Sequence, residues 1–286
     1  MRIGGLLLAF LLLCPSAPAV ASGTAMAPLT GIERVTALSA FDSTGVKGVQ
    51  VSCPAGKQVI GASGLLTMNS AAQGRVIMTE AIPDTALTSV TAFAWEDQTA
   101  TTGNWSIKAA AVCASALSSL VRVSASSAYD SSRSKSQVAS CPPHKWLLGA
   151  GRLIEGAEGQ VLLDRIEFSA NLRSVTVGAT EGQNGTSENW RVRAYAICGS
   201  VPPGHELVTA TSAATSDDKG RSVTCPSGKE AISAGGAVIG GDGQVALGNL
   251  VPGLSSPALA VAWAWEDHDG TAAAWSVRGQ GMCVSV

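Results

Sequence analysis

One spacing occurs three times in this chain and constrains its fold more than any other feature: a tryptophan followed eight residues later by a cysteine. A Cys-Pro dipeptide precedes each of these pairs, and the second cysteines of successive pairs lie 85 residues apart in both intervals. Such regularity predicts a tandem repeat of one structural unit, because unrelated domains would not keep a common spacing. The three pairs are Trp105 and Cys113, Trp190 and Cys198, and Trp275 and Cys283.

The repeat divides the chain into five predicted segments. Residues 1–21 are a predicted signal peptide and residues 22–28 a flexible N-terminus, followed by repeats over 29–116, 117–201 and 202–286. The stretches that join one repeat to the next are very short, which favours compact packing of the repeats against one another.

The predicted signal peptide combines Arg2, an apolar run over residues 4–13 and the small-x-small sequence Ala19-Val20-Ala21, which is the pattern that signal peptidase recognises. Lipoprotein processing at Cys14 is an alternative, but Leu13 stands where that pathway needs a small residue. The apolar run is too short to span a bilayer. We therefore expect a secreted, extracellular protein without a membrane anchor.

Six cysteines remain after the leader, an even number that predicts a disulfide framework in an oxidising compartment. The equivalence of the repeats leaves two symmetric sets of pairings: bridges inside each repeat, or links between successive repeats that close into a ring. Bridges inside each repeat are favoured because they do not require the two ends of the chain to meet. Each would stabilise its repeat by about 4 kcal/mol, so loss of one bridge is expected to loosen one repeat first. The favoured pairs are Cys53–Cys113, Cys141–Cys198 and Cys225–Cys283.

The charge of the chain is small and dispersed. Its formal net charge is -2, only 14% of its residues are charged, and its lysines and arginines are not gathered in runs. Proteins that bind nucleic acid or anionic membranes concentrate positive charge on one surface. The composition therefore argues against both partners and predicts a mild, hydroxyl-rich surface.

Turn and strand signals in every repeat predict an all-β protein. Residues 34–39 and 121–126 are strand-like, and polar loops follow them. The sequence from Cys53 to Lys57 is typical of a hairpin turn in which glycine takes the left-handed position. His144 stands at this position in the middle repeat, so it needs a left-handed backbone or a different turn. A Gly-x-Val step then opens a further strand in each repeat, at Gly74, Gly159 and Gly243.

The last strand of each repeat shows the clearest alternation. In the first repeat Trp105, Ile107, Ala109, Ala111 and Cys113 point to one face. The gradient from a large ring to small side chains beside the sulfur predicts a wedge-shaped core. No segment of ten or more residues has helical spacing with caps. We expect three equivalent sheets of four or five strands in a pseudo-threefold β-prism or, as the alternative, three small β-sandwiches in series.

The Cys-Pro-x-Gly-Lys turn, the Gly-x-Val step and the Trp-x7-Cys strand resemble the repeats of secreted actinobacterial proteins. This resemblance covers nearly the whole chain after the leader but implies no particular chemistry. The chain is also similar, more weakly, to vitelline membrane outer layer protein I, whose three-repeat β-prism uses Cys-Pro-x-Gly turns. That similarity implies a prism shape and hints at carbohydrate contact, although the further acidic motif of that protein is absent here.

Catalytic machinery is scarce in the sequence. His144, His205 and His268 fall at unrelated positions of the repeat, none belongs to an HExxH pattern, and no serine lies in a Gly-x-Ser-x-Gly motif. The acidic segments 217–218 and 266–270 do not recur in the other repeats, so a solvated loop is expected in each rather than a calcium site. We expect a protein without enzymatic activity, cofactor or metal.

The penultimate strand of the repeat supplies the candidate ligand-binding residues. One of its faces carries aromatic rings in the first and third repeats, and two carboxylates follow directly. Ring faces cover apolar C–H patches of a sugar, while carboxylates accept hydrogen bonds from its hydroxyls. In the middle repeat Thr176, Gly178 and Thr180 replace the rings, so the site is expected to be degenerate or lost there. The candidates are Phe93, Trp95, Glu96, Asp97, Trp263, Trp265, Glu266 and Asp267.

The same rings have an alternative, structural role, which is the first expectation because buried aromatic residues are the commoner case. If Trp95 pairs across the hairpin with Trp105, and Trp265 with Trp275, the rings extend the core. The connecting loop of nine residues does not fix the register, and a shift of one residue turns these rings to the opposite face. A third reading is an interface between copies of the protein.

Together these patterns predict a secreted, non-catalytic binding or surface-associated module whose ligand is a glycan or another cell-envelope polymer. Loops 96–104, 181–189 and 266–274 would form its variable surface. The alternatives are a self-associating extracellular coat or matrix protein, and a secreted hydrolase inhibitor that acts through one exposed loop. The sequence defines neither the oligomeric state nor the sugar nor a target enzyme.

Overall fold

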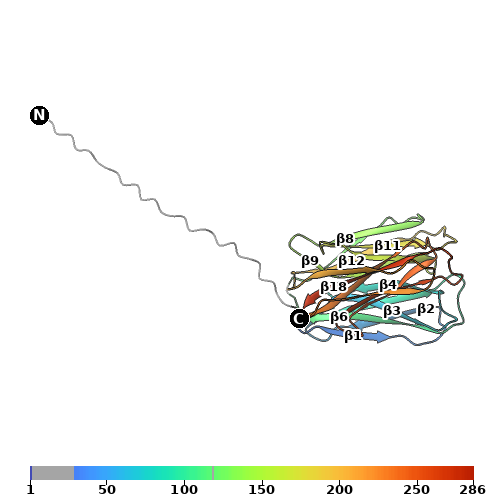
Figure 1. Cartoon of the computed structure of the whole chain (residues 1–286), viewed down its shortest axis with the longest axis horizontal. Helices are drawn as coiled ribbons and strands as arrows, with labels where there is room; N and C mark the ends of the chain where they lie inside the picture. The colour runs from blue at the N-terminus through green and yellow to red at the C-terminus, as the bar shows by residue number, and fades with distance from the viewer. Residues whose placement is uncertain (2–28, 118) are drawn as a thin grey trace.

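The computed structural model describes Met1, residues 29–117 and residues 119–286. The cleavage site of the predicted signal peptide and the predicted flexible segment 22–28 lie outside the described residues. Across the described ranges the chain forms eighteen β-strands and no helix, which confirms the all-β prediction. Those ranges therefore contain no helix long and apolar enough to cross a membrane. Figure 1 shows the strands running side by side along the body.

Six strands fall in each of the three predicted repeats. The first repeat contains β1 (Glu33–Leu38), β2 (Val46–Ser52), β3 (Lys57–Met68), β4 (Val76–Pro83), β5 (Ser89–Glu96) and β6 (Trp105–Ser115). The second contains β7 (Val121–Ser126), β8 (Ser134–Ser140), β9 (Trp146–Glu155), β10 (Val161–Phe168), β11 (Ser174–Glu181) and β12 (Arg191–Gly199). The third contains β13 (Glu206–Thr211), β14 (Lys219–Thr224), β15 (Lys229–Ile239), β16 (Val245–Pro252), β17 (Leu259–Glu266) and β18 (Ser276–Ser285).

Each repeat divides its strands between two groups of three. The first, sixth and third strands pair in one group, and the second, fifth and fourth pair in the other. Consecutive strands such as β5 and β6 therefore belong to different sheets. The prediction of three equivalent sheets of four or five strands is wrong, because the loops that look like hairpin connections cross from one sheet to another. The four sheets are ordered β1-β6-β3, β13-β18-β15-β10-β11-β8, β2-β5-β4-β9-β12-β7 and β14-β17-β16.

Two of these sheets join neighbouring repeats. Strand β4 of the first repeat pairs antiparallel with β9 of the second, and β10 of the second pairs with β15 of the third. Strand β16 of the third repeat lies beside β3 of the first. There the side chain of Asn249 makes the connection, since its amide accepts from the N–H of Leu66 at 2.6 Å and donates to the carbonyl of Leu66 at 3.1 Å. The first repeat thus contacts the second, the second the third, and the third the first.

The predicted turn chemistry is present in all three repeats. Gly56 and Gly228 have φ angles of 80° and 77°, in the left-handed region that glycine enters without steric cost. His144 adopts the same conformation with φ of 63°, which confirms that the middle repeat keeps the turn despite its side chain. The strands that follow the Gly-x-Val steps begin at Val76, Val161 and Val245, as predicted.

The last strands form the centre of the core, as predicted. In β6, Trp105, Ile107, Ala109 and Cys113 are completely buried, and Ala111 is nearly so. The small residues allow the facing strands to approach closely beside the sulfur, and the tryptophan fills the wider end of the wedge.

The disulfide pairing inside each repeat is confirmed. Each bridge links a cysteine that directly follows the second strand of a repeat to a cysteine in its last strand. It therefore connects the two three-stranded groups of the repeat. The Cα atoms of the bridged cysteines lie 5.6 to 5.8 Å apart, within the normal range for disulfides. The bridges are Cys53–Cys113, Cys141–Cys198 and Cys225–Cys283.

Candidate functional site

The aromatic candidates of the penultimate strands lie on the face of their sheets opposite the completely buried alanines. In β5 the alternate residues Ala92 and Ala94 are completely buried, whereas Phe93 and Trp95 are only partly covered. The predicted pairing of Trp95 with Trp105 is wrong, because Trp95 pairs with Val46 and Ile77 on either side in its own sheet. Trp95 therefore does not extend the wedge core across the hairpin, whereas Trp265 is partly buried and packs against the core of the first repeat.

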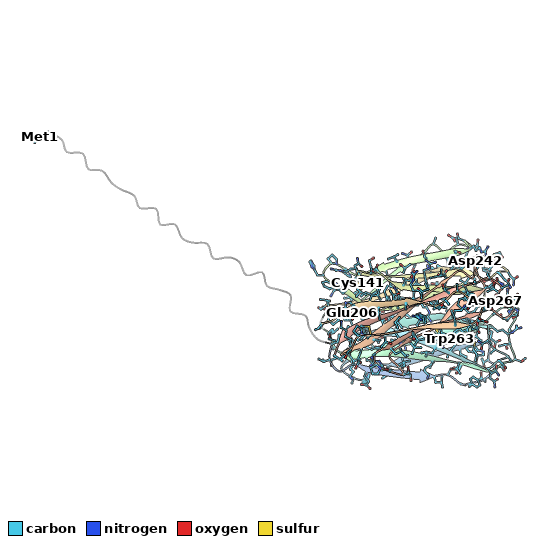
Figure 2. The ribbon with its side chains drawn as sticks, in the orientation of Figure 1. Met1, Cys141, Glu206, Asp242, Trp263 and Asp267 are labelled. Carbon is cyan, nitrogen blue, oxygen red and sulfur yellow. A yellow bond between two sulfur atoms is a disulfide. The ribbon has the colours of Figure 1, made fainter. Side chains whose placement is uncertain are left out.

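The outer rings cover glycines of the neighbouring strands. A Cβ atom added at Gly48 would lie 2.2 Å from the Phe93 ring, and one added at Gly220 would lie 2.2 Å from the Trp263 ring. The rings thus lie flat on exposed backbone, a contact that stabilises a sheet where glycine leaves a gap. Trp263 remains 39% exposed, so its outer ring surface is open to solvent. Figure 2 labels this residue on the body of the protein.

The predicted carboxylates Glu96 and Glu266 point inward, which corrects their assignment as ligand contacts. Glu96 accepts a hydrogen bond from the indole Nε1 of Trp105 at 3.0 Å, and Glu266 accepts one from Trp275 at 2.7 Å. The second oxygen of each carboxylate accepts a backbone N–H of the following loop. The middle repeat has the same arrangement with Glu181. These glutamates satisfy a buried indole rather than a ligand.

A lysine completes this arrangement on the face of each buried indole. The Nζ atoms lie 4.5, 4.7 and 3.6 Å from the ring centroids in the first, second and third repeats, which is cation–π geometry. Each ammonium also donates to the main-chain carbonyl of the same tryptophan. The lysines are Lys47, Lys135 and Lys219.

The loops that follow these glutamates converge at one end of the molecule, and each touches the Gly-x-Val step of another repeat. A Cβ atom at Gly74 of the first repeat would meet the backbone of 266–268 in the third. Gly159 of the second repeat meets 96–97 of the first in the same way, and Gly243 of the third meets 181–183 of the second. These approaches explain why the step requires glycine at this position.

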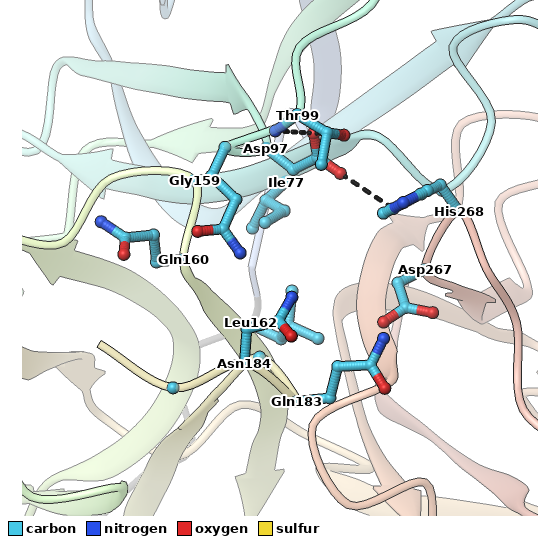
Figure 3. A pocket seen from close by; sticks show the side chains of 14 residues that line it. Ile77, Asp97, Thr99, Gly159, Gln160, Leu162, Gln183, Asn184, Asp267 and His268 are labelled. Carbon is cyan, nitrogen blue, oxygen red and sulfur yellow. Dashed lines mark hydrogen bonds and ion pairs between the residues drawn. The ribbon is translucent and has the colours of Figure 1, made fainter.

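A shallow pocket lies among these loops, which we call the end pocket. Residues of all three repeats line it, and Figure 3 shows their side chains around a central hollow. Ile77 and Leu162 form its apolar floor, and polar groups surround them. The polar side chains at its margin are Asp97, Gln98, Thr99, Gln160, Gln183, Asn184, Asp267 and His268. Two of the predicted site residues, Asp97 and Asp267, therefore belong to one pocket.

Asp97 is held in place from two repeats. Its Oδ1 atom accepts hydrogen bonds from the backbone N–H and the hydroxyl of Thr99, at 2.9 and 2.6 Å. Its Oδ2 atom lies 3.3 Å from Nδ1 of His268 in the third repeat. The Asp97 side chain is only 11% exposed. The pair fixes the orientation of both side chains at the edge of the pocket (Figure 3).

Asp267 is the most perturbed acid of this end. Burial, together with a hydrogen bond to Asp269 and its nearby negative charge, raises the pKa of Asp267 to about 7. Within the described residues its Oδ1 atom is buried without a hydrogen-bond partner. Asp269 in turn accepts a hydrogen bond from Gln183 of the second repeat at 2.5 Å. The cost of leaving Oδ1 of Asp267 without a donor is consistent with the raised pKa of this residue, because a proton on the carboxyl removes the buried charge.

The end pocket thus offers hydrogen-bond donors and acceptors in a form suited to a neutral polar ligand. Amides of Gln160, Gln183 and Asn184 both donate and accept, and the carboxylates accept. Among the described residues no group of three or more His, Cys, Asp or Glu side chains is arranged to hold a metal ion. Its chemistry is therefore hydrogen bonding from fixed loops over a small apolar floor.

Several residues of the end pocket were not predicted. The sequence identified His268 only as an isolated histidine, because its partner Asp97 belongs to another repeat. Gln183 and Asn184 fall in loop 181–189, which was predicted as variable surface; Asn184 also begins an Asn-x-Thr triplet of the glycosylation type, but neither residue was predicted as a ligand contact. The sequence signal that could have found the pocket is the residue after the equivalent glutamate of each repeat. These residues are Asp97, Gly182 and Asp267, and all three line the pocket.

Known proteins give no further identification of this site. No protein-family model matches the chain. No curated protein sequence matches it either.

Proposed function

We propose that this protein is a secreted, non-catalytic binding module whose ligand is a glycan or another cell-envelope polymer. The end pocket is the observation that carries the proposal. Amide, carboxylate and hydroxyl groups from three repeats surround a small apolar floor there, and sugar-binding sites combine these groups because a sugar ring has hydroxyl edges and apolar faces. The three disulfides are consistent with secretion, since such bridges persist in oxidising compartments.

The arrangement that we infer for the repeats is a pseudo-threefold β-prism, as in the three-repeat protein that the sequence resembles. The cyclic pattern of contacts supports it. At the sheets, β4 meets β9, β10 meets β15 and β16 meets β3. At the loops, the three glycines of the Gly-x-Val steps contact the other repeats in the opposite cyclic order. A prism brings the three variable loops to one end, where a single ligand can contact all of them.

A glycan array and a pull-down on isolated cell walls test the function. The exposed residues Gln183 and Asn184 allow a test that leaves the core intact, so we expect the double variant Gln183→Ala, Asn184→Ala to fold normally. Saturable binding by the native protein, weakened about tenfold or more in this variant, would support the end pocket. Ser256→Ala, in the exposed loop between β16 and β17, is the matched control and should bind like the native protein.

The outer rings provide a second arm of the same test. The double variant Phe93→Ala, Trp263→Ala removes two rings that cover glycine backbone. Lost binding with intact circular dichroism would assign the ligand to the outer face, whereas loss of the fold would assign the rings a structural role. The absence of saturable glycan or cell-wall binding, with concentration-dependent light scattering, would replace the proposal by a self-associating coat protein. Release of reducing sugar during incubation would contradict the non-catalytic assignment.

A further inference from the structure

We propose a second saccharide site on the outer face of the middle repeat, selective for a sugar that carries a carboxylate. We call it the β10–β11 groove. The inference rests on the proposed function for the class of its ligand but not on the end pocket for its position. Its polar lining consists of Arg133, Ser134, Asp164, Arg165, Thr180 and Asp242. Figure 2 labels Asp242 near the same end of the body as Asp267.

The groove lies where the middle repeat lacks a ring that the third repeat carries. In the third repeat Trp265 lies over Gly248, where an added Cβ atom would come within 1.6 Å of the ring. The corresponding residues of the middle repeat are Thr180 and Asp164, which are hydrogen bonded to each other instead. A threonine hydroxyl occupies much less space than an indole, so the surface is hollowed there. The sequence predicted a degenerate or lost site at this position, whereas the absence of the ring leaves a polar hollow.

Asp164 forms the floor of the groove, and its negative charge is already neutralised. Its Oδ1 atom accepts from Nε of Arg165 at 2.9 Å, and its Oδ2 atom accepts from the Thr180 hydroxyl at 2.8 Å. The Asp164 side chain is 19% exposed. Because both oxygens have partners, Asp164 positions Arg165 and Thr180 rather than attracting a cation.

Unused donors surround this floor. Within the described residues the two terminal nitrogens of Arg165 have no hydrogen-bond partner, since only its Nε atom is engaged. Arg133 makes one long contact, from Nη2 to the carbonyl of Asp242 at 3.4 Å. Two guanidinium groups with free N–H donors favour an anionic acceptor, and the planar fork of arginine matches a carboxylate in two parallel hydrogen bonds.

The rest of the lining favours a sugar as the carrier of that carboxylate. The hydroxyls of Ser134 and Thr180 lie 3.2 Å apart and can each exchange a hydrogen bond with a ligand hydroxyl. The carboxylate of Asp242 is exposed on the opposite side and accepts a further hydroxyl. Leu162 lines both the groove and the end pocket, so the two sites adjoin and suit successive residues of one polymer.

Isothermal titration with galacturonic acid trimer and with its methyl ester tests the proposal, because the two probes differ only in charge and ester groups. We expect the acid to bind about tenfold or more tightly than the ester at low salt. Arg165→Met keeps the aliphatic stem that packs over Gly178 and removes the guanidinium. It should weaken binding of the acid about tenfold or more, whereas Arg221→Met, which removes one exposed positive charge from the third repeat, should not.

A filled groove gives an independent measurement. The double variant Asp164→Gly, Thr180→Trp copies the pair formed by Gly248 and Trp265, so it should fold and abolish binding of the acid. Equal affinity for acid and ester, or unchanged affinity in both variants, would overturn the proposal. Acid binding that is lost with Gln183→Ala, Asn184→Ala but kept with Arg165→Met would overturn this site and retain the end pocket. The reverse result would support the β10–β11 groove even if the end pocket bound nothing.

Discussion

At the scale of single residues, Arg152 departs most from what a buried environment tolerates. It occupies the position on β9 that is glycine in the other repeats, Gly64 on β3 and Gly236 on β15, since all three pair with equivalent residues of the last strands. Its side chain is 1% exposed and contacts the sulfur of Met78. Among the described residues its Nε atom has no partner, and burial lowers the pKa of Arg152 to about 10.

We expect Arg152→Met to stabilise the protein. A charge buried without an anionic partner costs more than a thioether of similar length, and replacing buried ions by apolar residues is commonly favourable by about 1 to 4 kcal/mol. Urea unfolding would measure the change. Arg193→Met on the adjacent strand β12 is the control, because Arg193 is partly exposed and its ion pair with Glu155 contributes about 1 kcal/mol or less. Greater loss of stability with Arg152→Met than with Arg193→Met would contradict this interpretation.

His205 is a buried histidine whose contribution to stability depends on pH. Together with Trp146, Leu172 and Leu207 it lines a hollow between the second and third repeats. Burial lowers the pKa of His205 to about 4, from an ordinary value of 6.5. At this residue the unfolded chain therefore binds more protons than the folded protein between these two values, so the contribution of His205 to stability falls as the pH is lowered from 6.5 to 4. Asp267, whose pKa is raised to about 7, contributes in the opposite direction.

The substitution His205→Gln should remove the contribution of His205 and leave that of Asp267, because glutamine does not titrate; the variant should therefore lose less stability than the native protein as the pH falls from 6.5 to 4. The loss of stability across the window is at most about 3 kcal/mol, the free energy of the shift. Denaturation midpoints measured from pH 4 to pH 7 would show it. His144→Asn is the matched control, since His144 is exposed and asparagine tolerates its left-handed backbone. The same slope in His205→Gln as in the native protein would refute the assignment.

At the scale of elements, the indole with its glutamate and lysine is the unit that fixes each penultimate strand against the last one. In the middle repeat Glu181 is buried, and it accepts from Nε1 of the completely buried Trp190 at 3.0 Å. Its second oxygen accepts from the backbone N–H of Thr186 at 3.2 Å, which ties down the loop. One carboxylate thus links a core residue on one sheet to the loop that leads from the other.

We expect Glu181→Ala to cost about 1 to 3 kcal/mol, because it leaves a buried indole N–H without an acceptor. Glu181→Gln retains a carbonyl oxygen at this place and should lose much less. Glu188→Ala, on the same loop and exposed, controls for the change of charge. The measurement is the urea midpoint of the three variants. If the glutamine variant were as unstable as the alanine variant, the negative charge of Glu181 would be the stabilising feature instead.

Much of the element structure could be predicted from the sequence because its signals are local. The turn at Gly56, the strand that starts at Val76 and the alternation down to Cys113 all depend on residues a few positions apart. Which sheet a strand joins depends on residues far away in the sequence, so a local pattern does not show it. Outward rings such as Trp95 show the same alternation whichever neighbour they pair with, so the sequence could not exclude its pairing with Trp105.

The site was less predictable for a related reason. Asp97 and Asp267 were identified from the aromatic strands before them, yet their neighbours in the end pocket come from other repeats. Glu96 and Glu266 point inward because successive residues of a strand point to opposite faces, and the tryptophan before each glutamate points outward. The sequence shows this alternation but does not show which face of the strand is buried.

At the scale of the whole molecule, sharing of sheets between repeats makes the repeats interdependent. Strands β9 and β10 of the middle repeat pair with the first and third repeats, so an isolated middle repeat would expose two unpaired strand edges. We therefore expect a cooperative response to the loss of one disulfide, in place of the loosening of one repeat first.

We expect a single calorimetric transition, with equal van't Hoff and calorimetric enthalpies, both for the native protein and for the double variant Cys141→Ser, Cys198→Ser. Closing this loop contributes about 4 kcal/mol, so the variant should melt at a lower temperature in one step. Two resolved transitions in the variant, with one near the native melting temperature, would show that the repeats unfold independently.

The three junctions between repeats differ in the kind of hydrogen bond that holds them, because one depends on the side chain of Asn249. Two main-chain residue pairs join β4 to β9, and two join β10 to β15, whereas the side-chain amide of Asn249 joins β16 to β3. A side chain can rotate away without any strand moving. We therefore expect brief local opening to begin along β3, so its amide hydrogens should exchange with deuterated water sooner than those of β9 and β15. During synthesis the first repeat leaves the ribosome before the third, and these two repeats are joined at β3 and β16 by a side-chain contact that can be released without moving a strand.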